Sequence, residues 1–139
     1  MLAPDDRTAI VELAPVLRRA VALDPRGLAR LRLHDGSATV LVRLPFGVLV
    51  SRTVETPARA SALDITSRAV EFVSWVDGKG DVPEPRDLEW RGGLPPAAGW
   101  HRVESVPDTV LRPLVRSGAL ALKDAAEREG VPGAQPRAE

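Results

Sequence analysis

Cysteine does not occur in this chain of 139 residues. Its absence excludes disulfides, thiol nucleophiles and cysteine-ligated zinc or iron–sulfur sites. Asparagine and tyrosine are absent as well, which excludes N-glycosylation and tyrosine phosphorylation. The sequence also has no HExxH motif, no nucleophile elbow and no glycine-rich phosphate loop, and His34 and His101 do not stand at metal-ligand spacing. We therefore assign no catalytic residue, no metal ligand and no cofactor.

Long apolar runs are missing too. The longer uncharged stretches, such as 44–51 and 94–100, are far shorter than the roughly 20 residues that span a membrane. The N-terminus has no apolar segment of the kind that directs secretion. Basic and acidic residues balance at 19 each, so no overall charge attracts the protein to nucleic acid or anionic lipid. These features predict a soluble, cytoplasmic protein without a membrane partner.

The N-terminal segment has the pattern of an amphipathic helix. Apolar residues recur at helical spacing between residues 5 and 23, with charged residues set against them. Pro15 lies within this pattern and removes a backbone donor. We expect the helix to kink or to restart there.

Residues 28–54 predict a meander of three antiparallel strands. Two alternating runs, 28–34 and 37–44, flank Asp35-Gly36, a dipeptide favoured in type I′ hairpin turns. A β-branched run over 48–54 predicts the third strand. In the predicted hairpin register the apolar residues pair on one face, which we expect to be core: Leu33 with Ala38, Leu31 with Val40, and Ala29 with Val42.

The next part of the chain allows two interpretations. Residues 62–66 predict a fourth short strand, after which Ser67 could cap a helix that ends at Val76. The alternation of Val70, Phe72, Ser74 and Val76 is equally typical of a strand. We favour the helix.

Prolines and glycines punctuate residues 82–99 and predict a long loop, in which only 88–90 has an extended pattern. Ser105 and Asp108 have the spacing of a capping box, and an amphipathic helix is predicted over 106–129. Residues 130–139 predict a flexible C-terminal tail.

Together these elements predict one α+β domain over residues 1–129. An antiparallel sheet built on the 28–54 meander would pack against the 5–23 and 106–129 helices, because two amphipathic helices and a single-faced sheet can bury each other's apolar faces.

Two segments carry a resemblance to a known family: Leu44-Pro45-Phe46-Gly47-Val48-Leu49-Val50, and Trp90-Arg91-Gly92-Gly93-Leu94-Pro95-Pro96 with Gly99-Trp100. They resemble segments of a conserved, uncharacterised protein family of high-GC actinobacteria. The resemblance implies that the chain corresponds to the N-terminal domain of a longer protein. It implies no activity.

The face of the hairpin opposite to the apolar pairs carries Arg30, Arg32 and Arg43. These arginines could form an anion-binding or nucleic-acid-binding platform, although no aromatic residue for base stacking is interleaved with them. A solvated sheet face is the alternative. Arginine supplies 17 of the 19 basic residues, a bias expected of a high-GC genome, so an arginine cluster carries less weight here.

Trp90 and Trp100 flank the proline- and glycine-rich loop. Aromatic residues beside prolines can line a groove for a protein partner, and they can equally anchor a long loop to the core. We predict that the two indoles lie close together and clasp the 91–99 loop. The residues predicted to bind a partner are Trp90, Leu94, Pro95, Pro96 and Trp100.

Without a nucleophile, metal or phosphate motif, the sequence favours a non-enzymatic protein-interaction or regulatory module. The expected partner is another protein or a second copy of the chain. Nucleic-acid or anion binding through the arginine face of the hairpin is the alternative function.

Overall fold

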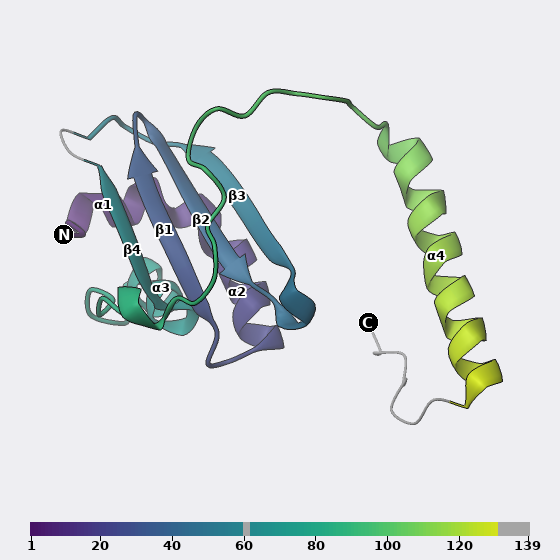
Figure 1. Cartoon of the computed structure of the whole chain (residues 1–139). Coiled ribbons are helices and arrows are strands. Elements are labelled where there is room, and N and C mark those ends of the chain that lie inside the picture. The colour runs from purple at the N-terminus through teal and green to yellow at the C-terminus, as the bar shows by residue number, and fades with distance from the viewer. Residues whose placement is uncertain (60–61, 131–139) are drawn as a thin grey trace. The chain divides into compact units, whose positions relative to one another are not determined.

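Residues 1–93 form a four-stranded antiparallel sheet with short helices on one face (Figure 1). The computed structural model describes residues 1–59 and 62–130. It divides the chain into two units, residues 1–93 and 94–139, and each is described by itself. The predicted α+β class is confirmed.

The N-terminal helical segment consists of three pieces: α1 (Pro4–Ala9), the 3₁₀ turn η1 (Val11–Leu13) and α2 (Ala14–Leu23). Pro15 lies in the first turn of α2, where its missing N–H is not needed. The helix therefore restarts at the proline, as predicted. Ile10, Leu13 and Leu17 are buried and form the apolar side of this segment.

The sheet contains β1 (Leu28–His34), β2 (Ser37–Arg43), β3 (Leu49–Glu55) and β4 (Leu63–Arg68) in the order β3-β2-β1-β4. The predicted hairpin register is confirmed, with Leu31 opposite Val40. Asp35 (φ 47°) and Gly36 (φ 74°) both adopt the positive φ that a type I′ turn requires. Since the fourth strand returns to lie beside the first, the sheet has Greek-key order.

The core lies between the helices and one face of this sheet. It contains alternate residues of the strands and the apolar sides of the helices, among them Ala29, Leu31, Leu33, Val40, Val42, Ile65, Phe72 and Trp75. The alternation of buried and less buried residues along β1 follows from the pleat, which turns successive side chains to opposite faces.

Residues 69–76 form a helix, α3 (Ala69–Val76), so the favoured interpretation is confirmed. Ser67, however, does not cap it. Ser67 is the buried penultimate residue of β4, and Arg68 is the N-cap. The strand continues two residues further than predicted because both residues pair with β1.

Residues 87–89 form a 3₁₀ turn, η3 (Asp87–Glu89), where an extended segment over 88–90 was expected. In the second unit, α4 (Asp108–Glu129) is preceded by Pro107 as N-cap, so the predicted capping box at Ser105 does not form. Gly130 ends α4 in the left-handed conformation (φ 59°).

Three predictions stay untested. Because the two units are described separately, the packing of α4 on the sheet and the single domain over 1–129 remain predictions. The predicted tail falls almost entirely on 131–139, outside the described residues.

Candidate functional site

The segment after α3 returns to the free edge of β4. The backbone N–H of Arg86 donates a hydrogen bond to the carbonyl oxygen of Thr66 (2.7 Å), and the N–H of Thr66 donates to Oδ1 of Asp87 (2.6 Å). These bonds satisfy backbone groups that an edge strand would otherwise leave unpaired. Thr66 and Leu41, on the sheet face opposite the helices, are both buried. The alternative interpretation, a solvated sheet face, therefore does not hold at these two residues.

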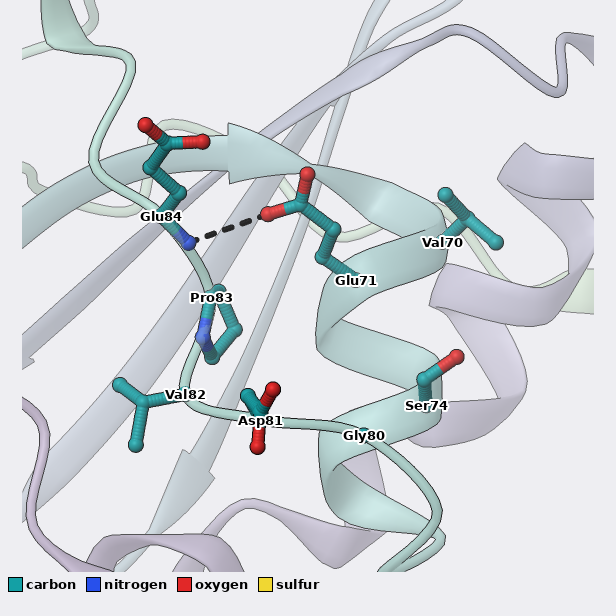
Figure 2. Close-up of a pocket in the computed structure, with 8 residues that line it drawn as sticks. All are labelled: Val70, Glu71, Ser74, Gly80, Asp81, Val82, Pro83 and Glu84. Atoms are coloured by element: carbon teal, nitrogen blue, oxygen red, sulfur yellow. Dashed lines mark hydrogen bonds between the residues drawn. The ribbon is translucent and has the colours of Figure 1, made fainter.

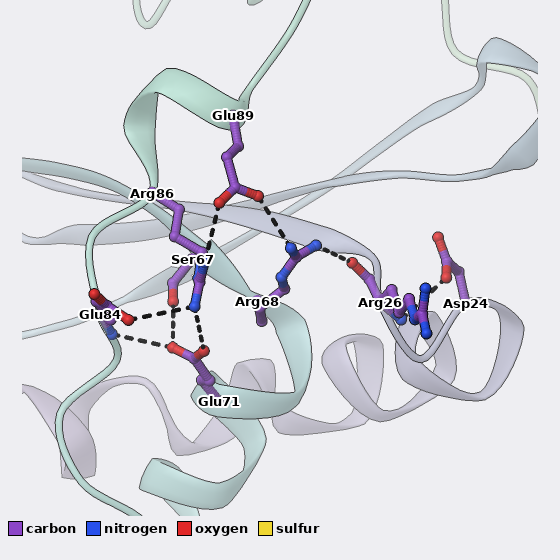
Figure 3. A network of polar contacts seen from close by, with 8 residues as sticks. All are labelled: Asp24, Arg26, Ser67, Arg68, Glu71, Glu84, Arg86 and Glu89. Carbon is purple, nitrogen blue, oxygen red and sulfur yellow. Dashed lines mark hydrogen bonds and ion pairs between the residues drawn. The ribbon is translucent and has the colours of Figure 1, made fainter.

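A network of charged side chains holds the same segment against the start of α3 (Figure 3). Glu71 accepts hydrogen bonds from Oγ of Ser67 (2.8 Å) and from the backbone N–H of Glu84 (3.0 Å). Arg86 lies 3.6 Å from Glu71 and donates to Glu89 (3.0 Å). The hydrogen bond with Glu89 raises the pKa of the Arg86 guanidinium, which therefore stays charged. The charged groups of this network therefore bind one another and hold residues 84–89 against β4 and α3.

A cavity of about 520 Å³ opens at the end of the sheet where β1 begins and β2 and β4 end. Leu28, the first residue of β1, pairs with Arg68. Ala29 pairs with Val42 on the other side, which brings the next residue of β2, Arg43, opposite Leu28. The Cα atoms of Arg43 and Arg68 are therefore two strand spacings apart, about 10 Å. We call the cavity the arginine–tryptophan cavity, after Arg26, Arg43, Arg68, Arg91 and Trp90 in its wall.

The arginine–tryptophan cavity carries excess positive charge. Its two acidic residues already have partners: Asp24 accepts a hydrogen bond from the backbone N–H of Arg26 (3.0 Å), and Glu89 forms an ion pair with Arg68 (3.1 Å). Within residues 1–59 and 62–130, the side chains of Arg26, Arg43 and Arg91 form no ion pair. The four arginines of the wall thus exceed its two carboxylates by two charges, and three of them have no ion-pair partner among the described residues.

Arg43 is held between Trp90 and Gly92. Its guanidinium carbon lies 5.3 Å from the centre of the Trp90 ring, a cation–π contact. Gly92 has φ 96°, and a Cβ atom placed there would lie 2.5 Å from Nη2 of Arg43. Nε1 of Trp90 is buried and has no hydrogen-bond acceptor in the described part of the chain. The indole therefore contacts the guanidinium through its ring, and its N–H takes no part in a hydrogen bond within the described residues.

Two of the three arginines predicted to bind an anion have an internal partner. Arg30 donates to Oδ1 of Asp64 (2.6 Å) and to Oγ1 of Thr66 (3.1 Å), and Nε of Arg32 lies 3.4 Å from Oδ2 of Asp64. The third, Arg43, lines the cavity. Sequence reasoning missed Arg26, Arg68 and Arg91, because only the pairing of β4 with β1 brings them to the same sheet end.

The residues predicted to bind a partner fall into both units. Trp90 is half-buried at the cavity of the first unit. In the second unit Leu94 and Pro95 are half-buried, Pro96 and Trp100 are exposed, and Nε1 of Trp100 donates to the carbonyl oxygen of Pro96 (2.6 Å). Since the units are described separately, the proximity of Trp90 to Trp100 stays a prediction.

A smaller cavity of about 260 Å³ lies between α3 and residues 80–84 (Figure 2). The carboxylate of Glu71 in its wall is directed to the backbone N–H of Glu84, and is thus part of the network described above. Among the residues that the structure describes, no three His, Asp or Glu side chains are grouped so that they could hold a metal ion. None of the described helices is both long and apolar enough to cross a membrane.

Helix α4 is a different kind of candidate. None of its 22 residues is buried. At 100° per residue, one side of the helix is apolar over residues 110–125, whereas Leu120 lies on the opposite side. We call this side the apolar face of α4, formed by Val110, Leu111, Leu114, Val115, Gly118 and Leu122.

Comparison with known families adds one finding. Residues 1–92 match the family described as Domain of unknown function (DUF8010). Searches of curated proteins and of solved structures gave no match.

Proposed function

The chain belongs to the family of the domain of unknown function DUF8010, and we propose that it is a non-enzymatic protein-interaction module that associates with a second copy of itself through α4. From the resemblance of its sequence segments we further infer that it is the N-terminal domain of a longer protein of high-GC actinobacteria. From its balanced charge and its lack of long apolar runs we infer that it is cytoplasmic.

The observation that carries this proposal is the unpaired apolar face of α4. In the described part of the second unit, residues 94–130, α4 is the only helix and no strand is present. An isolated helix is marginally stable in water, and most helical stability in proteins comes from packing of an amphipathic side. The apolar face of α4 therefore needs a partner surface from outside its own unit.

A second copy of α4 fits this need. Leu111, Val115, Gly118 and Leu122 follow each other at intervals of four, three and four residues, the spacing that keeps one helix against another. Gly118 has no atom within 4 Å of the place of a Cβ, so a second helix can approach closely there. A two-fold axis would bury the same side chains on both copies, each contributing about 1.5–3 kcal/mol when fully buried.

The alternative of nucleic-acid binding has less support. Arg30 and Arg32 share the carboxylate of Asp64, so the hairpin face offers less free positive charge than its sequence suggests. Base stacking would also need aromatic side chains along the strands, and the described residues of β1 and β2 include none.

The oligomeric state tests the proposal. We expect light scattering coupled to size-exclusion chromatography to give a dimer whose population rises with protein concentration. Leu114→Glu places a charge in the apolar face of α4 and should give a monomer. Leu120→Glu makes the same chemical change on the opposite side of the helix and should leave the dimer intact.

A wild-type monomer at every concentration would overturn the proposal. If the wild type is a monomer and Leu114→Glu unfolds at a lower temperature than the wild type, α4 instead packs on the sheet of its own chain.

A further inference from the structure

The arginine–tryptophan cavity supports a second function that is independent of α4. We propose that it binds a small phosphorylated molecule, whose phosphate group is held by Arg43 together with Arg26 and Arg91.

The argument begins with charge. The chain as a whole is neutral, yet three arginines without an ion-pair partner among the described residues line this one cavity. Like charges gathered in one concavity repel each other and attract an anion. A phosphate group offers several acceptor oxygens to the planar fork of each guanidinium, which makes it the anion that such a group of arginines recognises best.

The position of Arg43 supports the same ligand. The guanidinium lies over the Trp90 ring, and its Nη2 atom also lies close to Gly92. Stacking on an aromatic ring uses the face of the guanidinium and leaves the N–H groups in its plane free to donate. Arg43 is thus held in place before a ligand arrives, so less side-chain entropy is lost on binding.

The size of the cavity indicates more than a bare anion. Its volume of about 520 Å³ falls within the range of small-molecule sites. Apolar side chains of Leu28, Leu44 and Pro45 line it beside the arginines. A ligand that combines a phosphate with an apolar or planar body would contact both kinds of wall.

A nucleic-acid strand fits the cavity less well. A strand needs positive charge that continues along a groove. The nearest arginines on the same sheet face, Arg30 and Arg32, are occupied by Asp64. The arginines of this sheet face that have no ion-pair partner among the described residues are therefore confined to one cavity, which suits a small molecule better than a strand.

Isothermal titration calorimetry with three probes tests the inference on the full chain. Adenosine monophosphate supplies phosphate and a planar body, inorganic phosphate supplies the anion alone, and adenosine supplies the body alone. We expect the nucleotide to bind more tightly than inorganic phosphate, and adenosine not to bind measurably.

Variants locate the site. Arg43→Ala should weaken nucleotide binding by roughly 10-fold or more, because it removes a charge-assisted contact. Arg52→Ala removes the same charge from β3, outside the cavity, and should leave the affinity unchanged. Trp90→Phe keeps a ring beside Arg43 and should retain binding, whereas Trp90→Ala should weaken it. Circular dichroism checks that each variant is folded.

Several results would overturn the inference. If neither adenosine monophosphate nor inorganic phosphate binds saturably, the cavity is not a phosphate site. An equal loss in Arg43→Ala and Arg52→Ala would show unspecific attraction. Equal affinity for phosphate and nucleotide would disprove recognition of a ligand body. Tighter, steeply salt-dependent binding of single-stranded RNA would indicate a nucleic-acid surface instead.

Discussion

Asp87 shows how a single side chain fixes the segment after α3. Its Oδ1 atom accepts the hydrogen bond from the backbone N–H of Thr66, at the edge of β4. Thr66 is buried, so removal of the carboxylate leaves this partly buried N–H without a protein acceptor. The contact belongs to the fold, and it also holds the chain that leads to Trp90.

We predict that Asp87→Ala lowers the free energy of unfolding by about 1–3 kcal/mol, the cost of a buried donor left without an acceptor. Amide hydrogen exchange of Thr66 should become faster. Asp87→Asn keeps an oxygen at the same place and should cost less. Equal stability of Asp87→Ala and the wild type would show that water replaces the carboxylate without cost.

The hairpin of β1 and β2 is the element that local sequence determines most completely. Asp35 and Gly36 both have positive φ, and a Cβ atom at Gly36 would lie 3.3 Å from the carbonyl oxygen of Thr56. The turn therefore requires glycine for two separate reasons, its backbone conformation and the nearby carbonyl.

We predict that Gly36→Ala lowers the free energy of unfolding by about 1–2 kcal/mol, because alanine is strained at positive φ. Asp35→Asn should be neutral, since asparagine tolerates this conformation. Urea denaturation measures both variants. A smaller loss for Gly36→Ala than for Asp35→Asn would contradict the type I′ assignment.

At the scale of the whole molecule, the chain divides near residue 93. The first unit contains the sheet, the helices of its core and the arginine–tryptophan cavity. The second unit contains α4, which buries no residue. This division indicates that residues 1–93 can fold without the second unit.

We predict that a fragment of residues 1–93 unfolds cooperatively, with a midpoint in urea close to that of the full chain, and that it no longer dimerises. Full-length Leu114→Glu is the matched control, because it should lose the dimer while keeping the second unit at full length. A fragment that is unfolded or clearly less stable would instead support the single domain over 1–129 predicted from sequence.

The candidate sites differ in how far the sequence could predict them. The sequence singled out Arg43 and Trp90 separately, one on a strand and the other in a loop. It could not bring them together, because the two residues are 47 positions apart (90 minus 43) and no local pattern states where the loop returns to the sheet. The apolar face of α4, by contrast, follows from helical spacing alone.

Local sequence was enough to predict three features: the hairpin and its register, the restart of the helix at Pro15, and the long C-terminal helix. Hydrophobic period and turn chemistry act over a few neighbouring residues, so they can be read along the chain. The pairing of β4 with β1, and the return of the segment after α3 to the edge of β4, became visible only in the folded chain. These choices depend on contacts between distant residues, and they bring Arg68 and Arg91 to the sheet end where the hairpin already places Arg26 and Arg43.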